Sequence, residues 1–125
     1  MGPRLSRMNT KSTLLDPSCL GVCSLSEPLP EVAHGIVSRA VLTAPGLRLT
    51  LFHFAEGQEL SEHATPARAL VQVIAGSCEF TFADGARRLK AGDLIHMPPR
   101  LPHAVLALEA LTLLVAQVGG PSAGE

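Results

Sequence analysis

Short apolar runs separated by turn-forming residues dominate residues 35–118 and place the strongest limit on the fold. Pro45-Gly46 separates the run 35–43 from the run 47–54, and Asp84-Gly85 follows the alternating run 78–83. Proline presets φ and glycine accepts positive φ, so such pairs favour tight turns between strands. Gly76, Gly92 and Pro98-Pro99 separate the further runs 70–75, 87–90, 94–97 and 103–108. Many short strands at this spacing predict an all-β domain.

The segment from Leu106 to Val118 is the exception to this pattern. It reads LALEALTLLVAQV, and its leucines and alanines favour a helix on intrinsic propensity alone. The strands that precede it leave an open sheet to complete. We therefore expect this segment to form the final strand of the domain.

The chain divides into three parts by composition. Its 125 residues suit one domain. Residues 1–30 are rich in Ser, Pro and Leu without steady periodicity, which predicts an arm that is either flexible or laid across the barrel or a partner subunit. Residues 31–118 hold the predicted strands. Residues 119–125, GGPSAGE, have nothing to bury, so we expect a disordered tail.

Charge and hydropathy exclude several classes of function. The net charge is −1, there is no Trp or Tyr to stack on bases, and no basic stripe exists, which argues against nucleic-acid binding. The longest apolar stretch, 104–118, is interrupted by Glu109 and is shorter than the roughly 20 residues that span a bilayer. The N-terminus has no continuous apolar segment typical of a signal peptide. We expect a cytoplasmic protein that does not bind membranes.

Two histidines occur in informative settings. His63 lies between Gly57 and Gly76, and His103 follows Gly92 and Pro98. In this order and spacing the sequence resembles the two motifs of the cupin superfamily, and the segments EGQELSEH, ALVQVIAG and GDLIHMPPRLPHAV look like small "cupin 2" proteins. The resemblance covers roughly residues 35–118. It implies a double-stranded β-helix, or jelly-roll, barrel.

The resemblance also implies a metal site, but this sequence departs from the family pattern there. The usual site takes two His and one Glu from the first motif and one His from the second. His63 and His103 match the first and the last of these ligands, whereas Thr65 stands at the second His and Ala69 at the Glu. Arg100 and Ala107 replace a Gly and an Asn of the second motif. Two imidazoles alone hold a divalent ion weakly.

Three more side chains are candidates for the same pocket. His96, seven residues before His103, is a weaker candidate metal ligand if its strand turns it inward. Gln72 offers an amide oxygen, although counting by twos from Ala69 places it on the opposite face unless a bulge intervenes. Met97 lies on the same strand as His96. Arg68 and Arg100 flank the motifs and are candidates to bind an anion, while Arg48 is interpreted as a solvent-facing strand residue.

Three functions compete on these observations. The first hypothesis is a binding module whose pocket of His63, Thr65, Gln72, His96, Met97 and His103 holds a small molecule, with or without a weak divalent metal site. The alternative is a metal-dependent enzyme, a dioxygenase or isomerase, that uses Fe, Mn, Ni or Zn on a small carbonyl, enol or aromatic acid. The third is a structural barrel. The resemblance and the open sheet edges also predict a homodimer.

Overall fold

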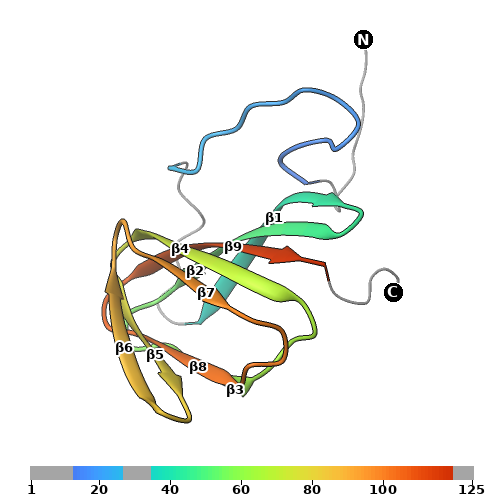
Figure 1. Cartoon of the computed structure of the whole chain (residues 1–125). Coiled ribbons are helices and arrows are strands. Elements are labelled where there is room, and N and C mark those ends of the chain that lie inside the picture. The colour runs from blue at the N-terminus through green and yellow to red at the C-terminus, as the bar shows by residue number, and fades with distance from the viewer. Residues whose placement is uncertain (1–12, 27–34, 120–125) are drawn as a thin grey trace.

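Two stacked antiparallel sheets form the body of the protein (Figure 1). The computed structural model describes residues 13–26 and 35–119. The first sheet has the strand order β1 (Ile36–Ala44), β2 (Leu47–Phe54), β9 (Leu111–Val118), β4 (Arg68–Ala75) and β7 (Leu94–Met97). The second has the order β3 (Glu59–His63), β8 (His103–Ala107), β5 (Ser77–Phe82) and β6 (Gly85–Lys90). The predicted all-β jelly-roll barrel is confirmed.

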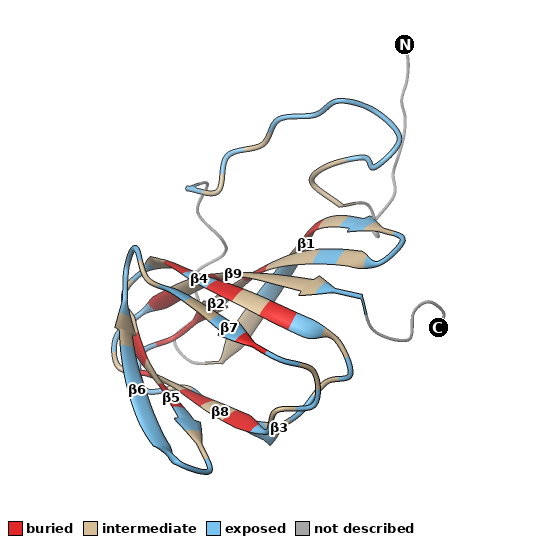
Figure 2. Cartoon of the chain, viewed as in Figure 1, coloured by how far each residue is buried: buried red, intermediate tan, exposed pale blue. Residues whose placement is uncertain are grey.

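The core lies between the two sheets, where alternate residues of β4, β5, β8 and the first part of β9 are buried (Figure 2). Strand β4 buries Ala69, Val71 and Val73, and β9 buries Leu111 and Leu113. The facing strands β5 and β8 contribute the buried residues Cys78, Phe80, Val105 and Ala107. This period of two produces one apolar interior, which is left open at one end.

Strand β9 lies at the centre of the five-stranded sheet, despite the helix propensity of its sequence. It pairs along its full length with β2 and with β4. The expected final strand is confirmed, with one correction to its start. Leu106 and Ala107 belong to β8, and a bend at 108–110 separates β8 from Leu111. Pairing on both sides outweighs local propensity here.

Strand β3 was not expected from the sequence. Its sequence, ELSEH, contains two glutamates and few residues that favour strands. Pairing with β8 alone holds it at the edge of the four-stranded sheet. The strand therefore depends on tertiary contacts, and it is the element that carries His63.

The described part of the N-terminal segment contacts the edge of the five-stranded sheet. The N–H groups of Leu14 and Leu15 donate hydrogen bonds to the carbonyl oxygens of Ala40 and Val41, at 3.2 and 2.7 Å. The segment then extends away from the barrel, where Leu20 and Val22 are 96% and 91% exposed (Figure 1). The predicted boundary at residues 30 and 31, and nearly all of the predicted tail, lie outside the described residues.

Two further features of the described residues are their free thiols and the absence of a long apolar helix. Cys19, Cys23 and Cys78 are all free thiols, and burial raises the pKa of Cys78 to about 11, which makes that thiol unreactive. In the part of the chain that the structure describes, no helix is long and apolar enough to span a bilayer.

Candidate functional site

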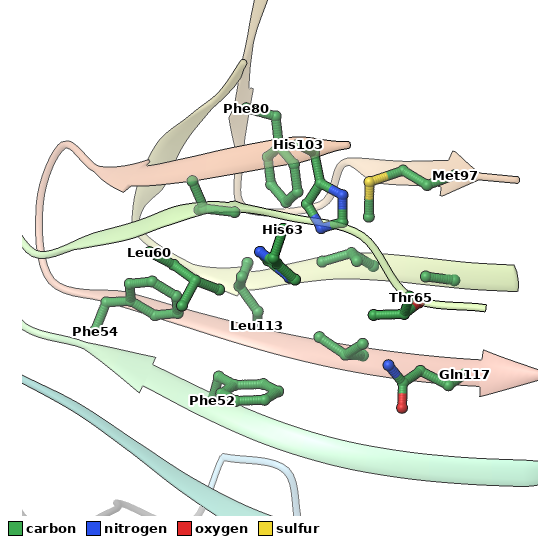
Figure 3. A pocket seen from close by; sticks show the side chains of 14 residues that line it. Phe52, Phe54, Leu60, His63, Thr65, Phe80, Met97, His103, Leu113 and Gln117 are labelled. Atoms are coloured by element: carbon green, nitrogen blue, oxygen red, sulfur yellow. The ribbon is translucent and has the colours of Figure 1, made fainter. Parts of the chain in front are cut away.

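A cavity of about 100 Å³ lies inside the barrel, and both motif histidines line it (Figure 3). We call it the His pocket. The residues that line it are Phe52, Phe54, Leu60, His63, Thr65, Ala69, Val71, Phe80, Met97, His103, Val105, Leu113, Val115 and Gln117. Most of them are apolar, and none is an Asp or Glu. The pocket is therefore an apolar chamber with a few polar groups on its wall, as small-molecule sites usually are.

A bulge in β3 turns His63 into this chamber. Leu60 pairs with Val105 and His63 pairs with His103, so β3 has one residue more than β8 between these two pairs. Residues three apart in a regular strand face opposite sides, but the extra residue brings Leu60 and His63 to the same face. His63 and His103 thus lie directly opposite each other on neighbouring strands.

The two imidazole rings are in contact. Their centroids are 4.3 Å apart and their planes are inclined at 58°. On its other side the His103 ring stacks on Phe80, with 6.3 Å between the ring centroids. His103 is only 8% exposed. Strand pairing and aromatic packing hold both rings in place without a ligand.

Backbone carbonyl groups fix the tautomer of both rings. The Nδ1 atom of His63 lies 3.0 Å from the carbonyl oxygen of Ser61, and that of His103 lies 2.9 Å from the carbonyl oxygen of Leu101. A carbonyl oxygen only accepts, so each Nδ1 carries the hydrogen and each neutral Nε2 is an acceptor. Within the described part of the chain, neither Nε2 has a hydrogen-bond partner.

The environment of His103 favours its neutral form. Burial is the main cause of its lowered pKa, and the neighbouring His63 lowers the pKa further, while the hydrogen bond to the Leu101 carbonyl acts in the opposite direction. The Nε2 lone pair of His103 is therefore available at neutral pH. The pocket presents the acceptors of two neighbouring rings, the buried His103 and the half-buried His63, and an unsatisfied acceptor on the buried ring is unfavourable.

The predicted pocket residues fall into two groups. His63, Thr65, Met97 and His103 line the His pocket, and Figure 3 shows them facing one space. Gln72 and His96 do not line it, which corrects the prediction for both. Gln72 is exposed, because the irregularity in β4 comes after it, between Val73 and Ala75.

His96 faces the outside of the sheet because its pairing partner Leu70 lies on the outer face of β4. Its Nε2 lies 2.6 Å from the Nη1 atom of Arg68, so both side chains are turned away from the cavity. Arg100, the other candidate anion ligand, is exposed and has a φ of 66°. That left-handed conformation explains why a glycine suits this position in the motif.

Sequence reasoning missed Gln117 as a pocket residue. Strand β9 turns residues 111, 113, 115 and 117 inward, and Gln117 is the one polar side chain among them. A lone polar residue at an inward position of an apolar strand was the available signal. Recognising it required the register of β9, which the sequence leaves undetermined.

The four-ligand metal set that the resemblance implies does not fit this pocket. Two imidazoles are present, while Thr65 and Ala69 occupy the positions of the other two ligands. Among the residues that the structure describes, no group of three His, Cys, Asp or Glu side chains is placed to hold a metal ion. A divalent ion here would have two neutral ligands and no carboxylate to balance its charge.

Known structures share this architecture. A conserved protein of unknown function from Streptococcus pyogenes is 29% identical, with a TM-score of 0.73, and the match covers 89% of this chain and 97% of that one. An RmlC-like cupin from Desulfovibrio desulfuricans is 23% identical, with a TM-score of 0.73 and coverage of 80% and 97%. No curated protein matches the chain.

The same fold also occurs in enzymes. A variant of salicylate 1,2-dioxygenase from Pseudoaminobacter salicylatoxidans is 18% identical, with a TM-score of 0.64, over 67% of this chain and 26% of that one. At this identity the likeness shows the fold alone.

Residues 50–116, more than half of the sequence, match the cupin domain. The chain therefore belongs to the cupin domain family.

Proposed function

We propose that the protein is a binding module that holds a small, mostly apolar molecule in the His pocket. The observation that carries this proposal is the pair of Nε2 acceptors in an apolar chamber, neither of which has a hydrogen-bond partner among the described residues. The O–H of a ligand hydroxyl group would satisfy one of them. The chamber has a volume of about 100 Å³, so it suits a small molecule.

The metal-dependent enzyme is the alternative, and elemental analysis separates the two. We expect protein purified without chelators to contain far less than one Fe, Mn, Ni or Zn per chain, because His63 and His103 have no carboxylate beside them. A stoichiometric metal that is lost in both His63→Ala and His103→Ala would contradict the binding module and favour the enzyme.

Binding itself is tested by nuclear magnetic resonance of the imidazole rings, with 2-propanol as the probe. We expect the alcohol to shift the ring signals of His63 and His103, and His63→Phe to weaken binding about fivefold, because it removes one acceptor and retains an aromatic ring. His96→Phe, on the outer face, is the matched control and should bind as the wild type does. An affinity that is unchanged in both His63→Phe and His103→Phe would rule out this pocket as the site.

We further propose that the protein is a homodimer in the cytoplasm and that the partner is a second copy of this chain. The outer edge of β1 is occupied by the backbone of Leu14 and Leu15, whereas β7 forms the opposite edge of the same sheet. Leu94 on β7 is 64% exposed. An unpaired edge with an exposed apolar side chain favours association.

A further inference from the structure

A second hollow adjoins the His pocket at the open end of the barrel. Its volume is about 370 Å³, and it lies between the β1–β2 turn and the connection from β3 to β4. We call it the outer pocket. The residues that line it are Thr43, Ala44, Gly46, Leu47, Arg48, Pro66, Ala67, Gln117 and Gly119. Gln117 also lines the His pocket, so the two hollows share this side chain.

One row of residues connects the two pockets across the five-stranded sheet. Gln117 of β9 pairs with Arg48 of β2 on one side and with Ala69 of β4 on the other. Ala69 in turn pairs with Met97 of β7. Residues paired in this way lie abreast, about 4.8 Å apart from strand to strand.

This row faces the interior of the barrel. Arg48 shares a face of β2 with Phe52 and Phe54, which line the His pocket. Met97, Ala69 and Gln117 line the His pocket, and Arg48 lies beyond Gln117 at the exposed rim. Figure 3 shows Gln117 at the end of β9, in the same space as Met97 and His103. A ligand could therefore extend from the histidines to Arg48 along one continuous wall.

The charges along this wall are complementary to a carboxylate. Among the residues that the structure describes, Arg48 is the only charged one that lines the outer pocket. The ion pairs of the described residues involve Arg87, Arg88 and Lys90, and Arg48 makes none of them. A guanidinium is always charged and presents a planar fork of donors that matches a carboxylate. The Gln117 amide adds two N–H donors.

We propose that the two pockets together bind a short-chain hydroxycarboxylate, with its hydroxyl donating to Nε2 of His63 or His103 and its carboxylate accepting from Arg48 and Gln117. This inference rests on the proposed function, because the hydroxyl uses the same nitrogens. A neutral hydroxyl suits the inner end better than an ammonium group, since apolar walls disfavour charge. The same burial favours the neutral form of His103 by lowering its pKa.

The test compares two probes that differ only in charge, 3-hydroxybutyrate and 3-hydroxybutyramide. Both are titrated into the full chain, and binding is followed through the ring signals of His63 and His103. We expect the acid to bind about tenfold more tightly than the amide, because a hydrogen bond to a charged group is stronger than one between neutral groups. Added NaCl should weaken the binding of the acid and leave the binding of the amide unchanged.

Variants of Arg48 test whether its side chain causes the difference in affinity between the acid and the amide. Arg48→Gln should reduce the affinity for the acid about tenfold and leave the amide unchanged, and Arg48→Lys should restore part of the loss. Arg39→Gln is the matched control, because Arg39 pairs with Leu51, on the opposite face of β2 from Arg48, and carries the same charge. Its affinities should equal those of the wild type.

Two results would contradict the inference in distinguishable ways. If acid and amide bind equally and Arg48→Gln changes neither, the carboxylate site is wrong while the binding module stands. If neither compound perturbs the two histidines, both the inference and the proposed function are wrong.

Discussion

At the scale of single residues, the site depends on which of the two ring nitrogens of each histidine is hydrogen-bonded to the backbone. Nδ1 is bound to the backbone two residues earlier, and Nε2 is left for the pocket. The sequence identifies His63 and His103 through their motif positions. It does not show the tautomer, because each Nδ1 partner is a backbone carbonyl oxygen, and that of Ser61 lies within the bulge in β3.

The buried His103 should make stability depend on pH. Its pKa in the folded chain lies below the ordinary value of 6.5, chiefly because of burial, so the unfolded chain binds the proton first as pH falls. Above about pH 6.5 this group does not make the free energy of unfolding vary with pH. Below it, the free energy of unfolding decreases until the pKa of the folded chain is passed.

Urea unfolding between pH 7.5 and 5 checks this prediction. His103→Gln should show a flatter dependence than the wild type. Equal slopes for the wild type and His103→Gln would show that His103 has no such role.

At the scale of elements, the turn glycines were easier to predict than the strand that carries His63. Gly57, Gly76 and Gly92 all have positive φ values, which glycine adopts without strain. The turns therefore follow from local chemistry. Strand β3 does not, because its polar sequence forms a strand only against β8. The register of a strand also depends on partners far away in the sequence. For this reason the sequence does not reveal that Gln117 faces the His pocket or that His96 faces away from it.

The turn at Gly76 also has no space for a side chain. A Cβ atom at Gly76 would lie 2.1 Å from the backbone oxygen of Ala110, while one at Gly92 would meet nothing within 4 Å. An alanine at either position has the strain of a positive φ. The difference in stability between the two variants therefore reports the steric contact at Gly76. We expect Gly76→Ala to lower the free energy of unfolding by about 2 kcal/mol more than Gly92→Ala does. Equal losses in urea unfolding would contradict this account.

At the scale of the whole molecule, the sequence predicted the barrel but could not predict the shape of its interior. Periodicity and turns determine which residues are buried. The connection between the His pocket and the outer pocket depends on strands far apart in sequence, β2, β9 and β4, being neighbours in one sheet. Arg48 was accordingly interpreted as an ordinary surface residue.

The proposed homodimer is a prediction at this scale. Sedimentation velocity at micromolar concentration should give a dimer, and Leu94→Lys should shift it towards the monomer by placing a charge on the exposed β7 edge. Thr81→Lys, an exposed position on the other sheet, is the control and should remain dimeric. A wild-type monomer would exclude the proposal.

The central position of the last strand has a consequence for biosynthesis. Because β9 is inserted between β2 and β4, these two strands have no partner between them until residues 111–118 have left the ribosome. The sheet cannot assemble progressively from its N-terminal end during translation. Such long-range pairing slows folding and leaves apolar strands exposed meanwhile, so the chain is at its most aggregation-prone before β9 has taken its place between β2 and β4.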